Sequence, residues 1–147
     1  MKNLFKLLAV CLLFLGCESK IDMSAKEVKL DRDVCAYCKM VISSANYAAQ
    51  IVLKDGRRYF FDDIGCAILW LNMQDAQDGA YIYVADFKSA EWIDAKRAYY
   101  LSGANSPMRF GFAAYKEFQK DSLNFLEVKK IILEKENETR HMAHHTH

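Results

Sequence analysis

Two thiols and a thioether lie close together in the segment Cys35-Ala36-Tyr37-Cys38-Lys39-Met40. Soft sulfur ligands of this kind select Cu(I), whereas imidazole and carboxylate groups suit harder ions. A Cys-x-x-Cys step lets two sulfurs converge from one turn of the chain, and Met40 follows Cys38 closely. The spacing therefore predicts a Cu(I) site whose local ligands are Cys35, Cys38 and Met40.

Two other uses of the Cys35/Cys38 pair stay open: a redox-active disulfide and a structural crosslink. Thioredoxin-like oxidoreductases carry this motif within a βαβ unit, but here it precedes the first expected hairpin. A disulfide that closes so short a loop stabilises a fold only slightly. A structural zinc site usually has four ligands, often from two cysteine pairs, and the chain has no second pair.

An incomplete ligand set suits a metal carrier, because transfer requires an open position for a ligand of the recipient. Met108, which follows Pro107, is the candidate that closes the site from a distant part of the chain, or else a core methionine. Cys66 lies in an apolar run and is a weaker candidate, since buried cysteines are commonly inert. Further weak candidates are the tail residues His141, His144, His145 and His147, which otherwise belong to a disordered end.

The first residues have the pattern of an export signal. Residues 1–16 combine two lysines with an apolar run that is too short to span a bilayer. The sequence Leu15-Gly16-Cys17 resembles a lipobox, which predicts lipidation of Cys17, although an ordinary signal peptide cut nearby is the alternative. The polar residues up to 32 would then be a tether. We therefore expect a periplasmic domain anchored to a membrane by lipid.

Charge and cysteine content narrow the class of protein. Without residues 1–16 the chain keeps 18 basic and 19 acidic residues, so it lacks the basic excess of nucleic-acid-binding proteins. Cys35, Cys38 and Cys66 remain beyond Cys17, an odd number that leaves at least one thiol free in a secreted protein. No phosphate loop, nucleophile elbow or zincin motif is present in the sequence, and an enzyme is not predicted.

The first half of the domain has the pattern of a ββα unit. Strand-forming residues fill 47–53 and 57–61, and the intervening Asp55-Gly56 is a strong hairpin signal. Asp63 is suited to cap a helix over 64–73, which has no alternation and is expected to be mostly buried.

The second half predicts a looser repeat of this unit. Strands are expected at 81–87 and 92–101 and a helix at 108–120, and 123–134 forms a last strand or helix. The predicted fold class is α+β, with two small pseudo-repeated ββα units packed together and an extra C-terminal element. The expected boundaries are a signal at 1–16, a lipidated tether at 17–32, a domain at 33–134 and a flexible tail at 135–147.

Several blocks, in order, give the chain a resemblance to the NosL family of lipoprotein accessory factors of nitrous oxide reductase. They are D-V-C-A-Y-C-K-M at 33–40, Y-A-A-Q-I at 47–51, F-D-D-I-G-C at 61–66, V-A-D-F at 84–87, E-W-I-D-A at 91–95 and Pro107-Met108. The resemblance extends from about Asp33 to Phe118. Lys39 and Arg109 stand where the family usually has glycine.

The resemblance implies a membrane-anchored Cu(I) chaperone that supplies copper for the reductase's copper centres, to an ABC-type maturation complex or to the reductase itself. It implies Cys38, Met40 and Met108 as ligands, with Cys35 as an alternate or additional thiolate. It also implies an α+β fold of two ββα units. A thiol–disulfide oxidoreductase and a lipoprotein that only sequesters copper are the alternative functions.

Overall fold

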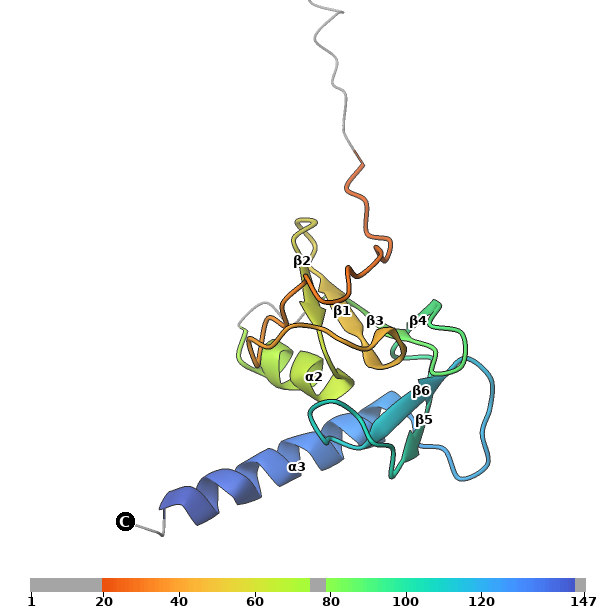
Figure 1. The fold of residues 1–147 in the computed structure, drawn as a ribbon. Coiled ribbons are helices and arrows are strands. Elements are labelled where there is room, and N and C mark those ends of the chain that lie inside the picture. The colour runs from red at the N-terminus through yellow and green to blue at the C-terminus, as the bar shows by residue number, and fades with distance from the viewer. Residues whose placement is uncertain (1–19, 75–78, 145–147) are drawn as a thin grey trace, which may run out of the picture.

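A computed structural model describes residues 20–74 and 79–144 and has an α+β fold, as predicted. In chain order the elements are a 3-10 helix η2 (Ala45–Tyr47), β1 (Ala49–Val52), β2 (Arg58–Phe61), α2 (Ile64–Asn72), β3 (Tyr81–Ala85), β4 (Trp92–Asp94), β5 (Tyr99–Ser102), β6 (Phe112–Tyr115) and α3 (Phe125–His144). Figure 1 shows α2 beside the larger sheet, with α3 running below α2 and away from the rest of the domain.

The larger sheet is antiparallel and has the strand order β2-β1-β3-β4. The predicted hairpin between β1 and β2 is confirmed. Gly56 has a φ of 85°, a left-handed conformation that glycine adopts at little cost. β1 is central and all four of its residues are buried. The sheet therefore provides a rigid base for the helix that follows β2.

The predicted helix after β2 is also confirmed. The Asp63 side chain accepts a hydrogen bond from the Gly65 N–H at 2.7 Å and caps α2. Such a cap satisfies one of the donors that the first turn of a helix leaves unpaired. Seven of the nine residues of α2 are buried, which agrees with the lack of alternation in its sequence.

The second half differs from the predicted repeat in two places. The expected strand at 92–101 is two strands, because a turn at Asp94 separates β4 in the larger sheet from β5 in a second sheet. The helix expected at 108–120 is wrong: Phe112–Tyr115 form β6, which pairs with β5. Periodicity alone does not distinguish a strand from a helix in a short apolar run. Here the run forms a strand because it pairs with β5.

The helix of the second half comes later, at α3. Asn124 accepts hydrogen bonds from the backbone N–H groups of Leu126 and Glu127, while Glu127 accepts one from the Asn124 N–H. This reciprocal capping box starts the helix, and Phe125, Val128 and Ile132 bury its apolar face. The helix continues to His144, so residues 135–144 of the expected tail are helical. Among the described residues, no helix is long and apolar enough to cross a bilayer.

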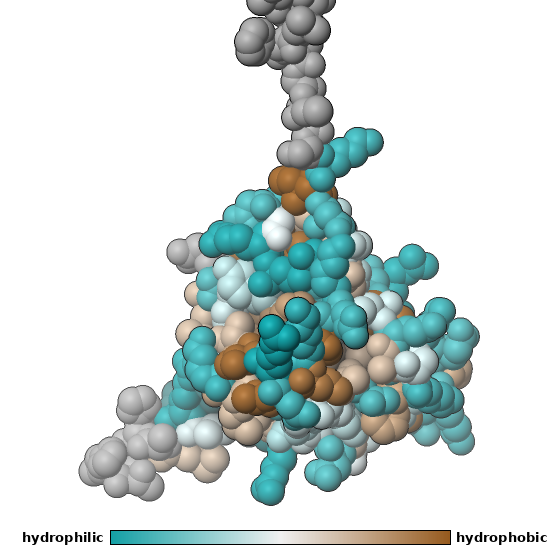
Figure 2. All heavy atoms as spheres, turned by 45° about the horizontal axis from the view of Figure 1, so that its top comes forward, coloured by the Kyte–Doolittle hydropathy of each residue, from teal (hydrophilic) through white to brown (hydrophobic). Residues whose placement is uncertain are grey.

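Residues 22–26, expected as part of a tether, are bound to the sheet. The buried Gln50 side chain accepts from the Lys26 N–H at 3.0 Å and donates to the Lys26 carbonyl at 2.9 Å. The Tyr83 hydroxyl donates to the Met23 carbonyl at 2.8 Å. The surface seen from this end is largely hydrophilic, with smaller groups of hydrophobic residues between (Figure 2). The predicted signal and the lipidation site Cys17 lie outside the described residues.

Candidate metal centre

Residues 35–40 form a closed turn, which we call the knuckle loop. The Cys35 N–H donates to the Met40 carbonyl at 2.8 Å, and the Lys39 N–H donates to the Cys35 carbonyl at 3.0 Å. An antiparallel bridge between Val34 and Val41 closes its base. The Ala36 N–H donates to the Phe60 carbonyl at 2.9 Å, so the loop is attached to the end of β2. Because β2 leads into α2, the knuckle loop lies beside the first turn of that helix.

This arrangement brings Cys66 to the two cysteines of the knuckle loop. The Sγ atoms of Cys35, Cys38 and Cys66 all lie within 4.8 Å of one another. Cys35 and Cys66 are fully buried, whereas Cys38 is partly exposed. We call these three residues the thiol cluster. Three converging thiols suit a soft metal ion, and the partial exposure of Cys38 gives the cluster an open side.

Cys35 is the acidic member of the thiol cluster. A hydrogen bond from the Cys66 thiol, together with the backbone N–H groups of Asp62, Cys38 and Tyr37, lowers the pKa of Cys35 to about 5, against the effect of burial. Hydrogen bonds to the charged form of a group favour that form. Cys35 is therefore a thiolate at neutral pH.

The other two thiols retain their protons at neutral pH. Burial, followed by the neighbouring Cys35 charge, raises the pKa of Cys38. Donation of its hydrogen bond to Cys35, then burial, raises the pKa of Cys66 strongly. The thiol cluster thus carries one negative charge, on the Cys35 sulfur, and the hydrogen bonds that this sulfur accepts stabilise the charge.

Two buried carboxylates, Asp62 and Asp63, lie next to the thiol cluster. Burial raises the pKa of Asp62, and the Cys35 charge adds to this effect. Burial also raises the pKa of Asp63, while the Ser106 hydroxyl and the N–H groups of Gly65 and Met108 oppose that rise. The backbone of Met108 therefore lies near the start of α2, although Met108 is far from α2 in the sequence.

The structure places the two predicted thioether ligands at different depths. Met40 is opposite Cys35 in the hydrogen-bonded pairing of the knuckle loop and is 51% exposed. Met108 is partly buried and packs against the hydrophobic core that includes Cys35 and Cys66, as Cys38 and Phe110 also do.

Lys39 and Arg109, which stand where the family usually has glycine, both have a backbone conformation that glycine favours. Lys39 has a φ of 65° and Arg109 a φ of 58°, in the left-handed region. The Lys39 ammonium also donates to the Ala36 carbonyl at 2.7 Å, within the knuckle loop. A residue other than glycine holds this conformation at a cost in strain.

We expect Arg109→Gly to stabilise the fold by about 0.5–1 kcal/mol. A left-handed residue other than glycine costs about 1–2 kcal/mol, and the greater freedom of glycine in the unfolded chain offsets part of that gain. Urea unfolding measures the difference. Lys120→Gly is the control, because Lys120 is exposed and does not have a positive φ, and it should be destabilising. Equal destabilisation by both variants would contradict the prediction.

The tail histidines are not part of the thiol cluster where the structure describes them. His141 lies on α3 and is exposed. His144 is the last residue of α3, and His145 and His147 lie outside the described residues. Two other residues of α3 contact the knuckle loop and the loop that carries Arg109. The Lys135 ammonium donates to the Arg109 carbonyl at 3.5 Å, and the Arg140 side chain interacts with Tyr37 of the knuckle loop.

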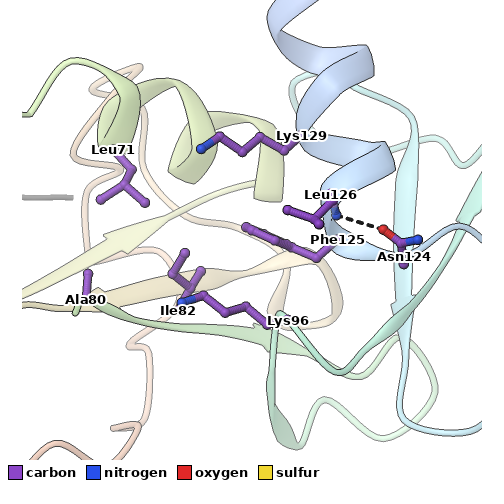
Figure 3. A pocket seen from close by; sticks show the side chains of 8 residues that line it. All are labelled: Leu71, Ala80, Ile82, Lys96, Asn124, Phe125, Leu126 and Lys129. Atoms are coloured by element: carbon purple, nitrogen blue, oxygen red, sulfur yellow. Dashed lines mark hydrogen bonds between the residues drawn. The ribbon is translucent and has the colours of Figure 1, made fainter. Parts of the chain in front are cut away.

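A separate cavity of about 500 Å³ lies between the C-terminal end of α2, β3 and the start of α3. Its lining includes Leu71, Ile82 and Phe125, with Lys96 and Lys129 at its edges (Figure 3). Neither a sulfur-containing residue nor a carboxylate lines it. This cavity is therefore not the metal centre.

The sequence made Cys66 only a weaker candidate ligand, and it did not indicate that Asp62 and Asp63 would lie beside the cysteines. An apolar helical run is the usual surrounding of an inert thiol, but the first turn of α2 faces the knuckle loop. The signal that could have identified Cys66 is its place three residues after Asp63, in the first turn of the helix that Asp63 caps at the end of a strand. The sequence cannot show that the knuckle loop is bonded to Phe60, which brings the parts together.

Comparison with known proteins agrees with the resemblance of the sequence blocks. A family model described as NosL matches residues 27–128, which include the knuckle loop, Cys66 and Met108. No curated protein matches the chain significantly. The matched segment is more than half of the 147-residue chain. The chain therefore belongs to the NosL family.

Proposed function

We propose that this protein is a Cu(I) carrier that delivers copper for maturation of the copper centres of nitrous oxide reductase. The observation that carries the proposal is the convergence of three cysteine sulfurs within 4.8 Å in a NosL-family chain. Thiolate and thioether ligands favour Cu(I), and a site with one partly exposed thiol can exchange ligands with a recipient. The role is transport of the metal, and no catalytic step is proposed.

In this proposal Cu(I) binds no more than four sulfurs at a time, drawn from the thiolates of Cys35, Cys38 and Cys66 and the thioethers of Met40 and Met108, so that one position stays open to exchange. Met40 supplies the exposed side of the site, since half of its surface is accessible. Met108 supplies the side formed by the loop between β5 and β6. The histidines of α3 and the tail, His141 among them, are not required.

The protein would work outside the cytosol, anchored by lipid on Cys17 at the periplasmic face of a membrane. Its recipient would be an ABC-type maturation complex or the reductase itself. Residues 22–26 of the expected tether are held on the sheet, which would keep the domain close to its lipid anchor. The support for this location is the export signal and lipobox-like sequence at the N-terminus.

Titration of the reduced chain with Cu(I) against a competing chelator tests the carrier proposal. About one Cu(I) per chain should bind, and Cys38→Ser or Met40→Leu should weaken binding. Met73→Leu is a matched control, because Met73 is 64% exposed and follows the end of α2. Cu(I) affinity in Cys38→Ser equal to that of the parent would show that the site is assigned wrongly. Loading the protein and mixing it with a recipient separates delivery from sequestration, since a sequestering protein would keep its copper.

Cu(I) binding at pH 7 should release about two protons. Cys35 is already ionised because its pKa is about 5, whereas the raised pKa values of Cys38 and Cys66 keep both protonated. Metal ligation requires thiolates, so affinity should rise with pH by up to about 100-fold per unit near neutrality. Calorimetric titration in two buffers of different ionisation enthalpy counts the protons. Cys38→Ser, which keeps the Cys66 hydrogen bond to Cys35, should release about one. Release near zero from the parent would contradict a three-thiolate site.

A further inference from the structure

Gly65 of α2 lies against Phe110, which belongs to the loop that carries Met108. A Cβ atom built on Gly65 would lie 2.1 Å from Cγ of the Phe110 ring, which no side chain tolerates. Gly65 does not have a positive φ, so its backbone conformation does not require glycine. Glycine in a helix is less favourable than alanine. The close approach of Phe110 is therefore the structural reason for glycine at this position.

The loop between β5 and β6, residues 103–111, is held together by its own hydrogen bonds. We call it the Met108 loop. Ser106 is buried and its hydroxyl accepts from the Gly111 N–H at 3.0 Å, while its carbonyl accepts from the Arg109 N–H at 2.9 Å. The Ala104 N–H donates to the Gly111 carbonyl at 3.1 Å. Met108 and Phe110 thus belong to one hydrogen-bonded loop, so displacement of the loop backbone at Phe110 should also displace Met108.

The same turn of α2 carries Cys66 next to Gly65, and Asp63 caps that turn. Figure 1 shows the Met108 loop lying against the start of α2. The influence of Ser106 and Met108 on the pKa of Asp63 supports this proximity. The position of the Met108 loop relative to Cys66 is therefore set at Gly65 and Asp63.

We propose that Gly65 is a positioning residue for copper binding: its missing side chain lets Phe110 seat the Met108 loop on α2, which places the Met108 thioether beside the thiol cluster. This inference rests on the proposed Cu(I) site and adds the contact that closes it. The metal then joins the knuckle loop, α2 and the Met108 loop at one point.

Gly65→Ala in the full chain tests the proposal, with Cu(I) affinity and the number of sulfur neighbours of bound copper as readouts. Affinity should fall about 10- to 100-fold, as for other groups that orient metal ligands, and about as much as in Met108→Leu. X-ray absorption of the loaded protein should show one sulfur fewer in both variants. The double variant should bind no more weakly than Met108→Leu alone, because both changes remove the same ligand.

Gly56→Ala is the matched control, since it makes the same chemical change outside the Met108 loop. Gly56 has a φ of 85° and a Cβ there would meet Ile21 at 2.8 Å, so alanine strains the β1–β2 hairpin without displacing Phe110. It should lower stability and leave Cu(I) affinity unchanged. Should Gly65→Ala fail to fold, Phe110→Ala removes the ring instead and should also lower affinity and lose one sulfur.

The outcomes separate this inference from the proposed function. If Cu(I) affinity is unchanged in Gly65→Ala and Phe110→Ala but falls in Met108→Leu, Gly65 does not position the ligand. If Met108→Leu also binds normally while Cys38→Ser does not, Met108 is not a ligand and the inference is wrong, although the thiol site stands. Normal binding in Cys38→Ser as well would overturn the proposed function itself.

Discussion

Replacing Cys35 by serine should lower Cu(I) affinity by more than about 100-fold. Removal of groups that merely orient a metal ligand costs about 10- to 100-fold, and loss of a charged thiolate ligand should cost more than this and more than loss of a neutral thioether. Cys35 is the centre of the thiol cluster, because Cys66 and three backbone N–H groups direct hydrogen bonds to its sulfur. A serine hydroxyl is not ionised at neutral pH and is a hard ligand that suits Cu(I) poorly.

Competition titration with a Cu(I) chelator measures this loss, and circular dichroism checks that the variant is folded. Cys17→Ser is the control, since it also removes one cysteine but leaves the thiol cluster unchanged. The account predicts parental affinity for Cys17→Ser and weak binding for Cys35→Ser. Similar affinity in both variants would mean that copper binds elsewhere on the chain.

Oxidation of the thiol cluster should abolish Cu(I) binding, and reduction should restore it. The three Sγ atoms are close enough that small movements bring any pair toward the disulfide bond length of about 2.05 Å. A disulfide consumes two of the three thiols, and the remaining thiol cannot form the site. The ionised Cys35 is the expected attacking sulfur, because thiolates rather than thiols carry out this exchange.

A mild thiol oxidant, thiol counting and Cu(I) titration before and after reduction test this reversible loss. Two fewer free thiols should accompany the loss of copper binding. An oxidised chain that lacks two thiols yet binds Cu(I) normally would contradict the account. Catalytic turnover with thiol substrates, lost in Cys35→Ser but unaffected by Met40→Leu, would instead favour a thiol–disulfide oxidoreductase.

The first half of the fold could be predicted because its signals are local. Asp55-Gly56 specifies the hairpin and Asp63 specifies the start of α2, and both depend on residues adjacent in sequence. The second half could not, because the residues from Phe112 to Tyr115 become a strand only through pairing with β5. The short apolar run has no local feature that excludes a helix.

The candidate site shows the same difference between local and distant information. Cys35, Cys38 and Met40 could be named from spacing, since one turn of chain brings them together. Cys66 joins them only because Ala36 is hydrogen-bonded to Phe60 at the end of β2. The acidity of Cys35 depends on donors from several parts of the chain, which spacing cannot reveal.

Copper X-ray absorption of the reduced, Cu(I)-loaded chain shows whether the thiol cluster is the copper site. We predict a first coordination shell made of sulfur alone, with at least three sulfur neighbours, and the same spectrum when His141 is replaced by alanine. A first shell dominated by nitrogen or oxygen would contradict it, because the thiol cluster would then not be the copper site.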